Sequence, residues 1–331
     1  MAEAEAELAE CEQTSSGFVF GEIHRLGLEN NVLELEEQGF TIVPDALPMD
    51  MVERMREVII DQVADKNGGE RPDLETWDEG NLPSGCYLLY EDPIFEKLAL
   101  NEYTIALMQY LLGRSMILST IYSHVRAKGD ASLPLHTDQW TLQLSNPVSV
   151  AVANYALVDY KRDLGAFAAV PGSNLMMRRP TAPDEVNVYK NPQCIPLEMS
   201  AGSVVVTAGD CGMVNRSTLH GSYPNQSPGA RITMVIGFHK RDSAIGSRAT
   251  NVHAFKSTRG GQTKDITYTK NDVLHRARMI PIAIDARRQY YPHEVPYDYQ
   301  GSYLGTGVWN EQVRSEISEP DNEYWQRDIT L

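Results

Sequence analysis

The chain has 331 residues, 42% of them hydrophobic and 22% charged, which is long enough for one large domain with extensions or for two domains. Its formal net charge of −16 argues against a nucleic-acid-binding surface, because such a surface requires a basic patch. No apolar run approaches the roughly 18 residues that a membrane span needs, so we expect neither nucleic acid nor a membrane as a partner.

The cysteines and the first residues indicate the compartment. The four cysteines form no C-x-x-C pair, and their scatter is typical of reduced thiols rather than of a zinc ribbon or a disulfide framework. The opening MAEAEAELAE has neither a basic region nor an apolar core, so no secretory signal is expected. Residues 1–17 are predicted to be a disordered acidic tail. A cytoplasmic protein is the resulting expectation.

Helical patterns dominate the first third of the chain. Residues 36–44 predict a helix end, a glycine and a short strand. Apolar residues at helical spacing then predict a helix from Pro48 to the glycines at 68 and 69. Residues 66–90 are rich in Gly, Pro, Asp and Glu and predict a long loop. Asp92 followed by Pro93 is typical of a helix start, so one helix or two in succession are expected to reach Gly113.

From residue 115 the pattern changes to short apolar segments separated by turn signals. In one of them Val148, Val150 and Val152 alternate onto a single face. Strands are expected at 115–125, around His136, and at 148–157, 167–170, 202–207 and 232–238. Helices followed by many short strands favour an α+β chain with an antiparallel double-sheet jelly roll and flanking N-terminal helices.

Two segments show no clear strand or helix pattern. Residues 174–196 contain several prolines and predict a long surface loop. Residues 243–331 are polar and rich in tyrosine. We therefore expect a domain over residues 18–241 and an extension over 242–331 that packs on it. The extension would act as a substrate lid or as a subunit contact, so a homodimer is among the expectations.

Two metal-ligand types occur together in the segment Leu135-His136-Thr137-Asp138. Side chains alternate along a strand, so His136 and Asp138 are expected on one face. With a second histidine they would complete the 2-His-1-carboxylate triad of non-haem iron(II) oxygenases. With 8 histidines and 45 acidic residues, chance alone predicts roughly one such pair, so the motif depends on its partners elsewhere in the chain.

Those partners follow in the second half of the chain. His220 lies after a Val-rich strand, at a distance in sequence that still permits neighbouring strands in a jelly roll. Arg231 opens the next strand, where a buried guanidinium can hold a carboxylate with two parallel hydrogen bonds.

Five segments in this order resemble the phytanoyl-CoA hydroxylase-like family of Fe(II)/2-oxoglutarate dioxygenases. They are residues 38–44, 135–138, 164–173, 199–203 and 220–231. The resemblance implies a double-stranded β-helix core of cupin-like type, with iron(II) bound by His136, Asp138 and His220. It also implies that Arg231 and Ser222 bind the co-substrate 2-oxoglutarate, and that O2 is the oxidant.

The chain departs from the family pattern at two positions. Asn174 follows Pro-Gly-Ser where a histidine is usual, and Phe167 stands where many members carry a Thr or Ser that some use for the co-substrate. This departure implies that the contact is either absent or supplied from elsewhere, with Thr233 and Asn154 as the candidates. The presence of Asp138 disfavours the halide-binding variant of the site.

The resemblance predicts an oxygenase that oxidises, most simply by hydroxylation, an unactivated C–H bond of a small, largely apolar organic molecule. Such an enzyme would release succinate and CO2 and would fit specialised metabolism. Candidate substrate contacts are Trp140, Phe167 and Met176. Two alternatives stay open: a jelly-roll metal- or ligand-binding protein without turnover, and a cupin-like metal enzyme that uses no keto acid.

Overall fold

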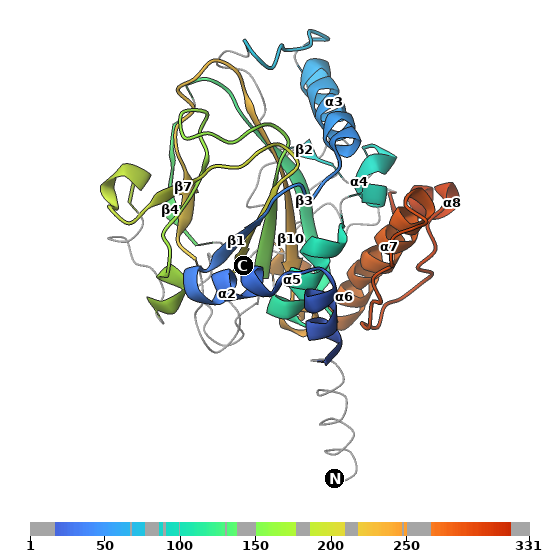
Figure 1. Cartoon of the computed structure of the whole chain (residues 1–331). Helices are drawn as coiled ribbons and strands as arrows, with labels where there is room; N and C mark the ends of the chain where they lie inside the picture. Colours follow the sequence, from blue (N-terminus) through green and yellow to red (C-terminus); the bar gives the residue numbers. More distant parts are fainter. Residues whose placement is uncertain are drawn as a thin grey trace.

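Two facing antiparallel sheets and a layer of helices make up the protein (Figure 1). The computed structural model describes residues 17–66, 68–76, 86–88, 91–98, 100–129, 131–137, 150–176, 186–208, 218–246, 248–249 and 266–318. The acidic tail expected at 1–17 lies outside this range except for Gly17. In the described part, no helix combines the length and the apolar composition that a bilayer crossing requires.

The larger sheet has six strands in the order β1-β8-β5-β10-β3-β2, and every neighbouring pair is antiparallel. Their bounds are β1 Phe40–Val43, β8 Val204–Ala208, β5 Val150–Ala156, β10 Arg231–His239, β3 Ile117–Arg126 and β2 Cys86–Tyr87. The smaller sheet follows the order β4-β9-β6-β7, also antiparallel. Its strands are β4 Leu133–His136, β9 His220–Ser222, β6 Phe167–Ala169 and β7 Ile195–Leu197. A short hairpin pairs β11 Arg248–Ala249 with β12 Ile266–Thr267. This arrangement confirms the predicted α+β jelly roll.

Strand alternation gives the larger sheet two different faces. On β10, Ile232, Met234 and Ile236 belong to the main hydrophobic core, which also contains the buried residues of the helices. Arg231 and Thr233 alternate with them and therefore face the smaller sheet. The space between the sheets thus receives the polar ends of Arg231 and Thr233, while the three core residues of β10 point to the helices.

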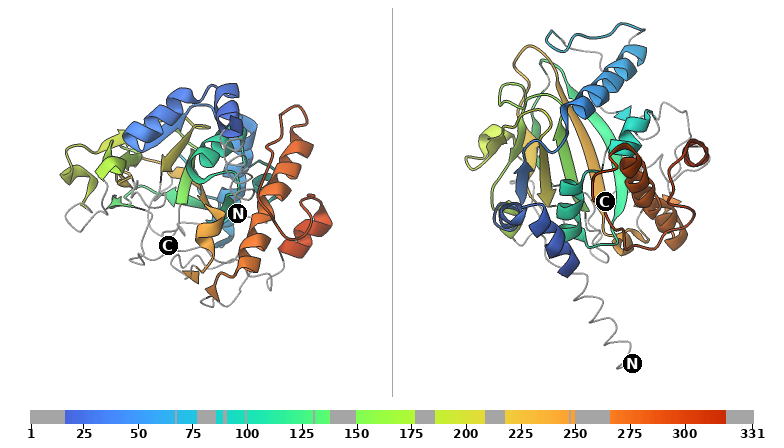
Figure 2. Two further views of the ribbon diagram at one scale, coloured as in Figure 1. Left: turned by 90° about the horizontal axis from the view of Figure 1, so that it is seen from below. Right: turned by 45° about the vertical axis from the view of Figure 1, so that its right-hand side comes forward.

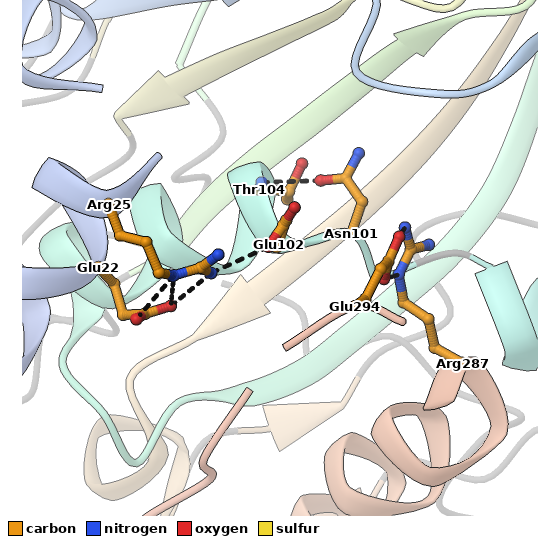
Figure 3. A network of polar contacts seen from close by, with 7 residues as sticks. All are labelled: Glu22, Arg25, Asn101, Glu102, Thr104, Arg287 and Glu294. Atoms are coloured by element: carbon orange, nitrogen blue, oxygen red, sulfur yellow. Dashed lines mark hydrogen bonds and ion pairs between the residues drawn. The ribbon is translucent and has the colours of Figure 1, made fainter. Parts of the chain in front are cut away.

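The helices gather on the side of the larger sheet that lies away from β4 and β7 (Figures 1 and 2). Those of the first third are α2 Glu29–Gln38, α3 Met49–Lys66, α4 Pro93–Leu98 and α5 Glu102–Leu112. The expected helix from residue 92 is two helices, because the Asn101 side chain accepts a hydrogen bond from the Thr104 amide at 2.8 Å and caps a new start (Figure 3).

Ion pairs tie this layer together at its surface. Arg25, in a helical turn that spans residues 17–25, binds Glu22 at 2.8 Å and Glu102 of α5 at 2.9 Å (Figure 3). Arg287 forms a bidentate pair with Glu294 at 2.6 and 2.7 Å. The pairs of Arg25 are partly exposed, and such pairs typically contribute only about 0–1 kcal/mol, so the layer depends mainly on its apolar packing.

The long loop expected at 174–196 is only partly a loop. Residues Ser173–Met176 and Val188–Lys190 form 3-10 turns, and Ile195–Leu197 is strand β7. The sequence does not predict this strand because Pro196 lies within it. Proline is tolerated there because, among the described strands, β7 has β6 as its single partner and forms the edge of the smaller sheet.

The C-terminal segment contributes helices α6 Lys270–Ala277, α7 Met279–Tyr290 and α8 Glu311–Ile317. A capping box between Thr269 and Asp272 starts α6. Ile280, Ile282 and Ala283 of α7 join the same core as α4. The principal contacts of α6 and α7 are with α4 and β3 rather than with the smaller sheet. These helices therefore complete the helical layer, and the role expected for the extension as a lid or subunit contact stays a prediction.

Arg276 anchors this segment to the sheet. Between Gly237 and Phe238 the register of β10 against β3 shifts, which makes Ser119 an extra residue in a β-bulge. The buried Arg276 guanidinium donates to the Leu118 carbonyl at 3.0 Å and also to the Ser119 carbonyl. Arg276 of α6 thus provides hydrogen-bond donors for the β3 carbonyls at the bulge, where the regular pairing with β10 is interrupted.

Glu96 is a second buried charge in the helical layer. Its carboxylate accepts a hydrogen bond from Arg314 Nε of α8 at 2.8 Å, but the side chain is only 1% exposed. Burial outweighs the attraction of Arg314 and raises the pKa of Glu96 to about 7. The folded protein therefore holds this proton more tightly than the unfolded chain.

We expect Arg276→Met to destabilise the fold by several kcal/mol, because each buried acceptor left without a donor costs about 1–3 kcal/mol. Urea unfolding measures this loss. The control is Arg288→Met on α7, whose arginine is largely exposed beside Asp285 and should change stability little. Equal stability of the two variants would contradict the role of Arg276.

The second prediction concerns pH. Because the folded pKa of Glu96 is raised from 4.5 to about 7, its contribution to stability is present at low pH and is lost as the pH rises through that window. The Glu96→Gln variant should be about as stable as the native protein near pH 5. At pH 8 its free energy of unfolding should be higher than that of the native protein by on the order of 3 kcal/mol. Melting temperatures across this range measure the difference. Glu316→Gln, which changes an exposed partner of Arg278, serves as control; a gap that does not vary with pH would contradict the shift.

Candidate functional site

His136 and His220 face each other across the smaller sheet. They are direct partners in the antiparallel pairing of β4 with β9, and their ring centroids are 4.4 Å apart at an interplanar angle of 53°. Paired residues on one face of a sheet are close enough for both imidazoles to reach a single metal ion. The fold therefore brings together two histidines that are 84 residues apart in sequence.

This close approach depends on a glycine and a bulge. The pairing shifts between Leu133 and His136, so β4 carries one more residue than β9 over this stretch. A Cβ on Gly221 would lie 2.5 Å from the Leu133 carbonyl oxygen and 2.9 Å from that of Pro134. Only glycine leaves room for the β4 backbone at this position.

The backbone also selects the tautomer of both rings. His136 Nδ1 lies 2.9 Å from the Pro134 carbonyl oxygen, and His220 Nδ1 lies 3.0 Å from that of Thr218. A carbonyl can only accept, so each Nδ1 carries the proton, and each neutral ring presents the lone pair of Nε2. Metal-binding histidines typically have this arrangement.

The third expected ligand, Asp138, and the expected substrate contact Trp140 lie outside the described residues. Among the residues that the structure describes, no three His, Cys, Asp or Glu side chains form a metal-binding cluster. The donor set of two neutral imidazoles fits the predicted iron(II) site, and Asp138 follows His136 by two residues in the sequence.

Phe167 and Ser222 lie beside the histidines. The Phe167 ring stacks on His220 with centroids 5.3 Å apart and planes 13° from parallel. Ser222 pairs with Phe167 in the adjoining strand, and its hydroxyl accepts a hydrogen bond from the Leu133 amide at 3.4 Å. Because that hydroxyl accepts from Leu133, its own hydrogen can be donated to another group.

Arg231 lies close to the same strands from the opposite sheet. It is buried, and its Nη1 donates to the carbonyl of Gly165, two residues before Phe167. Its guanidinium lies 5.2 Å from the centre of the Tyr160 ring, within the range of a cation–π contact. The positively charged guanidinium of Arg231, which is expected to bind a carboxylate, is thus held between the two sheets.

Thr233 and Tyr160 form a hydroxyl pair next to this arginine. The Tyr160 hydroxyl and Thr233 Oγ1 are hydrogen-bonded to each other, and both residues are buried. Burial raises the pKa of the Tyr160 phenol above its ordinary value, so it stays protonated. Asn154, the other expected alternative, alternates with the core residues Ala153 and Tyr155 and also faces the smaller sheet. No sequence motif marks Tyr160, and only the closure of the sheets reveals its position.

Met176 is not brought to this site. It packs with Leu135, Ala168 and Leu219, which alternate with His136, Phe167 and His220 along their strands. Met176 therefore lies on the opposite face of the smaller sheet, and its position does not support the expected substrate contact.

The family departure at Asn174 has a structural explanation. The buried Asn174 amide donates to the carbonyls of Leu35 and Glu36, at 3.3 and 3.0 Å, and so satisfies the C-terminal end of α2. Gly39 continues the chain there with a left-handed φ of +86°, and a Cβ at this position would lie 2.9 Å from Asn174. Asn174 thus holds helix α2 against the sheet end and does not lie beside the histidines.

Several solved structures have folds similar to that of this chain. The non-heme alpha ketoglutarate dependent carbocyclase SnoK from nogalamycin biosynthesis has a TM-score of 0.52 at 20% identity, covering 71% of this chain and 93% of its own. HygX from Streptomyces hygroscopicus, with nickel and 2-oxoglutarate bound, has a TM-score of 0.50 at 18% identity, with coverages of 64% and 86%. The epimerase SnoN, also from nogalamycin biosynthesis, has a TM-score of 0.50 at 18% identity, with coverages of 73% and 91%. At these identities the likeness establishes the shared fold.

The sequence match is decisive for the family. Residues 35–233, more than half of the chain, match the profile of the phytanoyl-CoA dioxygenase (PhyH) family. This range contains both paired histidines, Asp138 and Arg231. The chain belongs to the phytanoyl-CoA dioxygenase family and is a 2-oxoglutarate-dependent oxygenase.

Proposed function

We propose that the protein hydroxylates an unactivated C–H bond of a small, largely apolar organic molecule in specialised metabolism. In this proposal iron(II) is held by His136, Asp138 and His220, and 2-oxoglutarate is held by Arg231, Ser222 and Thr233. The main observation behind this proposal is that the imidazoles of His136 and His220 lie opposite each other and that both Nδ1 atoms are hydrogen-bonded to backbone carbonyls.

The backbone holds both histidine rings in an orientation suited to metal binding. Their Nδ1–H groups are fixed by the backbone, so neither ring has to change tautomer or rotate when a metal binds at Nε2. The stacked Phe167 ring further restricts His220. Asp138 would add the negative charge that offsets the charge of a divalent ion.

The co-substrate would lie between the two sheets. Its keto-acid end would chelate the metal beside the histidines, and its distal carboxylate would reach the guanidinium of Arg231. When bound, iron(II) supplies the activation of dioxygen that is coupled to oxidative decarboxylation of 2-oxoglutarate to succinate and CO2.

The apolar character proposed for the substrate follows from the lining between the sheets. A cluster that includes Phe40, Ala156 and Val205 adjoins Phe167 there. Such a surface excludes water from a reactive centre and favours an apolar reactant over a charged one. SnoK and SnoN come from the biosynthesis of a natural product, which is consistent with a substrate from specialised metabolism.

We expect His136→Ala, Asp138→Ala and His220→Ala each to abolish tight iron(II) binding. Changes to groups that only support a ligand typically cost about 10–100-fold in affinity, so loss of a ligand should exceed this. Anaerobic calorimetric titration with Fe(II) measures the effect. His293→Ala, which alters an exposed histidine, is the control, and native affinity in any of the three variants would remove that residue from the site.

Arg231→Leu should weaken binding of 2-oxoglutarate by about 2–5 kcal/mol, because the carboxylate would lose its charged partner in a buried position. The measurement is an anaerobic titration of the Fe(II)-loaded protein, read by the visible charge-transfer band of the chelated keto acid. Iron affinity measured on the same sample controls for misfolding.

Arg231→Lys keeps the positive charge but lacks the planar guanidinium. Its affinity for 2-oxoglutarate should therefore lie between that of the native protein and that of Arg231→Leu. An unchanged titration in Arg231→Leu would show that the carboxylate binds elsewhere.

A further inference from the structure

The carbonyl that orients His220 belongs to a residue outside the strand pairing. In the described sheet β9 begins at His220 itself, so its ladder does not include Thr218, two residues earlier. The Thr218 carbonyl nevertheless accepts the hydrogen bond of His220 Nδ1 at 3.0 Å. Another contact is therefore needed to hold this carbonyl in place.

The side chain of Thr218 supplies such a contact. Its hydroxyl donates to the Gly39 carbonyl at 2.7 Å, and the residue is only 2% exposed. Gly39 ends helix α2 and leads directly into β1 (Figure 1). Thr218 thus binds the end of α2 with its side chain and His220 with its backbone.

Leu219 is connected to the same helix through a turn. Its amide donates to Ser173 Oγ at 2.9 Å. Ser173 opens a 3-10 turn whose next residue, Asn174, donates to the Glu36 carbonyl of α2 at 3.0 Å. Both residues that precede His220 are therefore tied to the end of α2.

The atoms at this junction are closely packed. Gly39 has a left-handed φ of +86°, and a Cβ there would overlap the Thr218 hydroxyl and lie 2.9 Å from Asn174. Closely packed interiors transmit strain instead of absorbing it. A displacement of the end of α2 would therefore also displace Thr218.

His136 is held in a different way. Its Nδ1 donates to the carbonyl of Pro134, which lies within β4 itself. The side chain of Pro134 has no hydrogen-bond donor that could tie this residue to another element. The connection to a helix through a side-chain hydroxyl therefore distinguishes His220 from His136.

We propose that Thr218 is a positioning residue for His220 and that, together with Ser173, it couples the end of α2 to the metal centre. The Thr218 hydroxyl fixes the residue whose carbonyl accepts the Nδ1 proton, so Nε2 keeps its lone pair and its direction before a metal binds. Without the hydroxyl the carbonyl would move, and the ring would also adopt the tautomer that is protonated at Nε2 and cannot bind a metal there. This inference rests on the proposed function, since it takes His220 as a metal ligand.

Thr218→Val tests this role because it removes the hydroxyl and keeps the shape of the side chain. Binding of Ni(II), measured by calorimetry without turnover, should weaken about 10–100-fold, as is typical when a group that supports a ligand is lost. Thr218→Ser keeps the hydroxyl, so its affinity for Ni(II) should stay within about threefold of that of the native protein.

A second measurement observes the rings in the metal-free protein. Long-range proton–nitrogen NMR of histidine-labelled protein distinguishes the two tautomers of a neutral imidazole. His220 should be protonated at Nδ1 in the native protein and in Thr218→Ser, and should be a mixture of both tautomers in Thr218→Val. His136 should keep one tautomer in all three proteins. A general loss of stability would not produce this difference between the two rings.

Thr41 provides a matched control on the same helix. Its buried hydroxyl also links α2 to β1, since it donates to Glu34 and accepts from Asn31 Nδ2 at 2.8 Å. Thr41→Val therefore removes a buried hydroxyl of the same kind without changing a contact of Thr218. Its melting temperature should fall about as much as that of Thr218→Val, while its Ni(II) affinity and the tautomer of His220 should remain native.

Three results would overturn the inference: Ni(II) affinity within twofold of the native protein in Thr218→Val, an unchanged tautomer of His220 in that variant, or an equal loss of affinity in Thr41→Val. If His220→Ala abolishes Ni(II) binding and Thr218→Val does not weaken it, the inference fails and the proposed function stands. If the native protein binds no Ni(II), both fail. Should Thr218→Val not fold, Ser173→Ala, which removes the connection at Leu219, decides by the same criteria.

Discussion

The antiparallel pairing of β4 with β9 is the constraint on which the rest of the site depends. It makes His136 and His220 direct neighbours, and Gly221 lets the two backbones approach closely enough. The same backbones accept the Nδ1 protons of both rings, so one local structure fixes their separation, orientation and tautomer. A slip of one residue would turn either ring to the opposite face, where Leu135 and Leu219 pack in an apolar cluster.

The interior between the sheets combines an apolar lining with one polar point. Arg231, Thr233 and Tyr160 meet there, and the surrounding residues such as Ala156 and Val205 exclude water. Charged hydrogen bonds are strongest in such surroundings, and an incomplete set is costly. The carboxylate clamp proposed for 2-oxoglutarate would therefore make strong charged hydrogen bonds at this point.

The helical layer supports this arrangement from behind. Residues of α4 and α7, which are far apart in sequence, share one core beneath the larger sheet. Arg276 of α6 satisfies the carbonyls at the bulge in β3, next to the strand that carries Arg231 and Thr233. The C-terminal segment is thereby part of the structure that holds β10 in register, although its described helices lie away from the histidines.

The sequence by itself determined the jelly-roll class, and it predicted the metal-ligand residues and the arginine, because each of these inferences rests on local alternation or on short motifs. It also indicated the family, since five ordered segments span residues 38–231 and the family match covers nearly the same range. It did not predict β7, which contains a proline, or the helices after residue 269, whose apolar positions are mixed with charges. Only the tertiary structure decided that Met176 packs behind the smaller sheet, that Asn174 caps α2, and that Tyr160 lies under Arg231. These facts depend on which strands pair and which faces meet, and such long-range contacts leave no periodic signal in the chain.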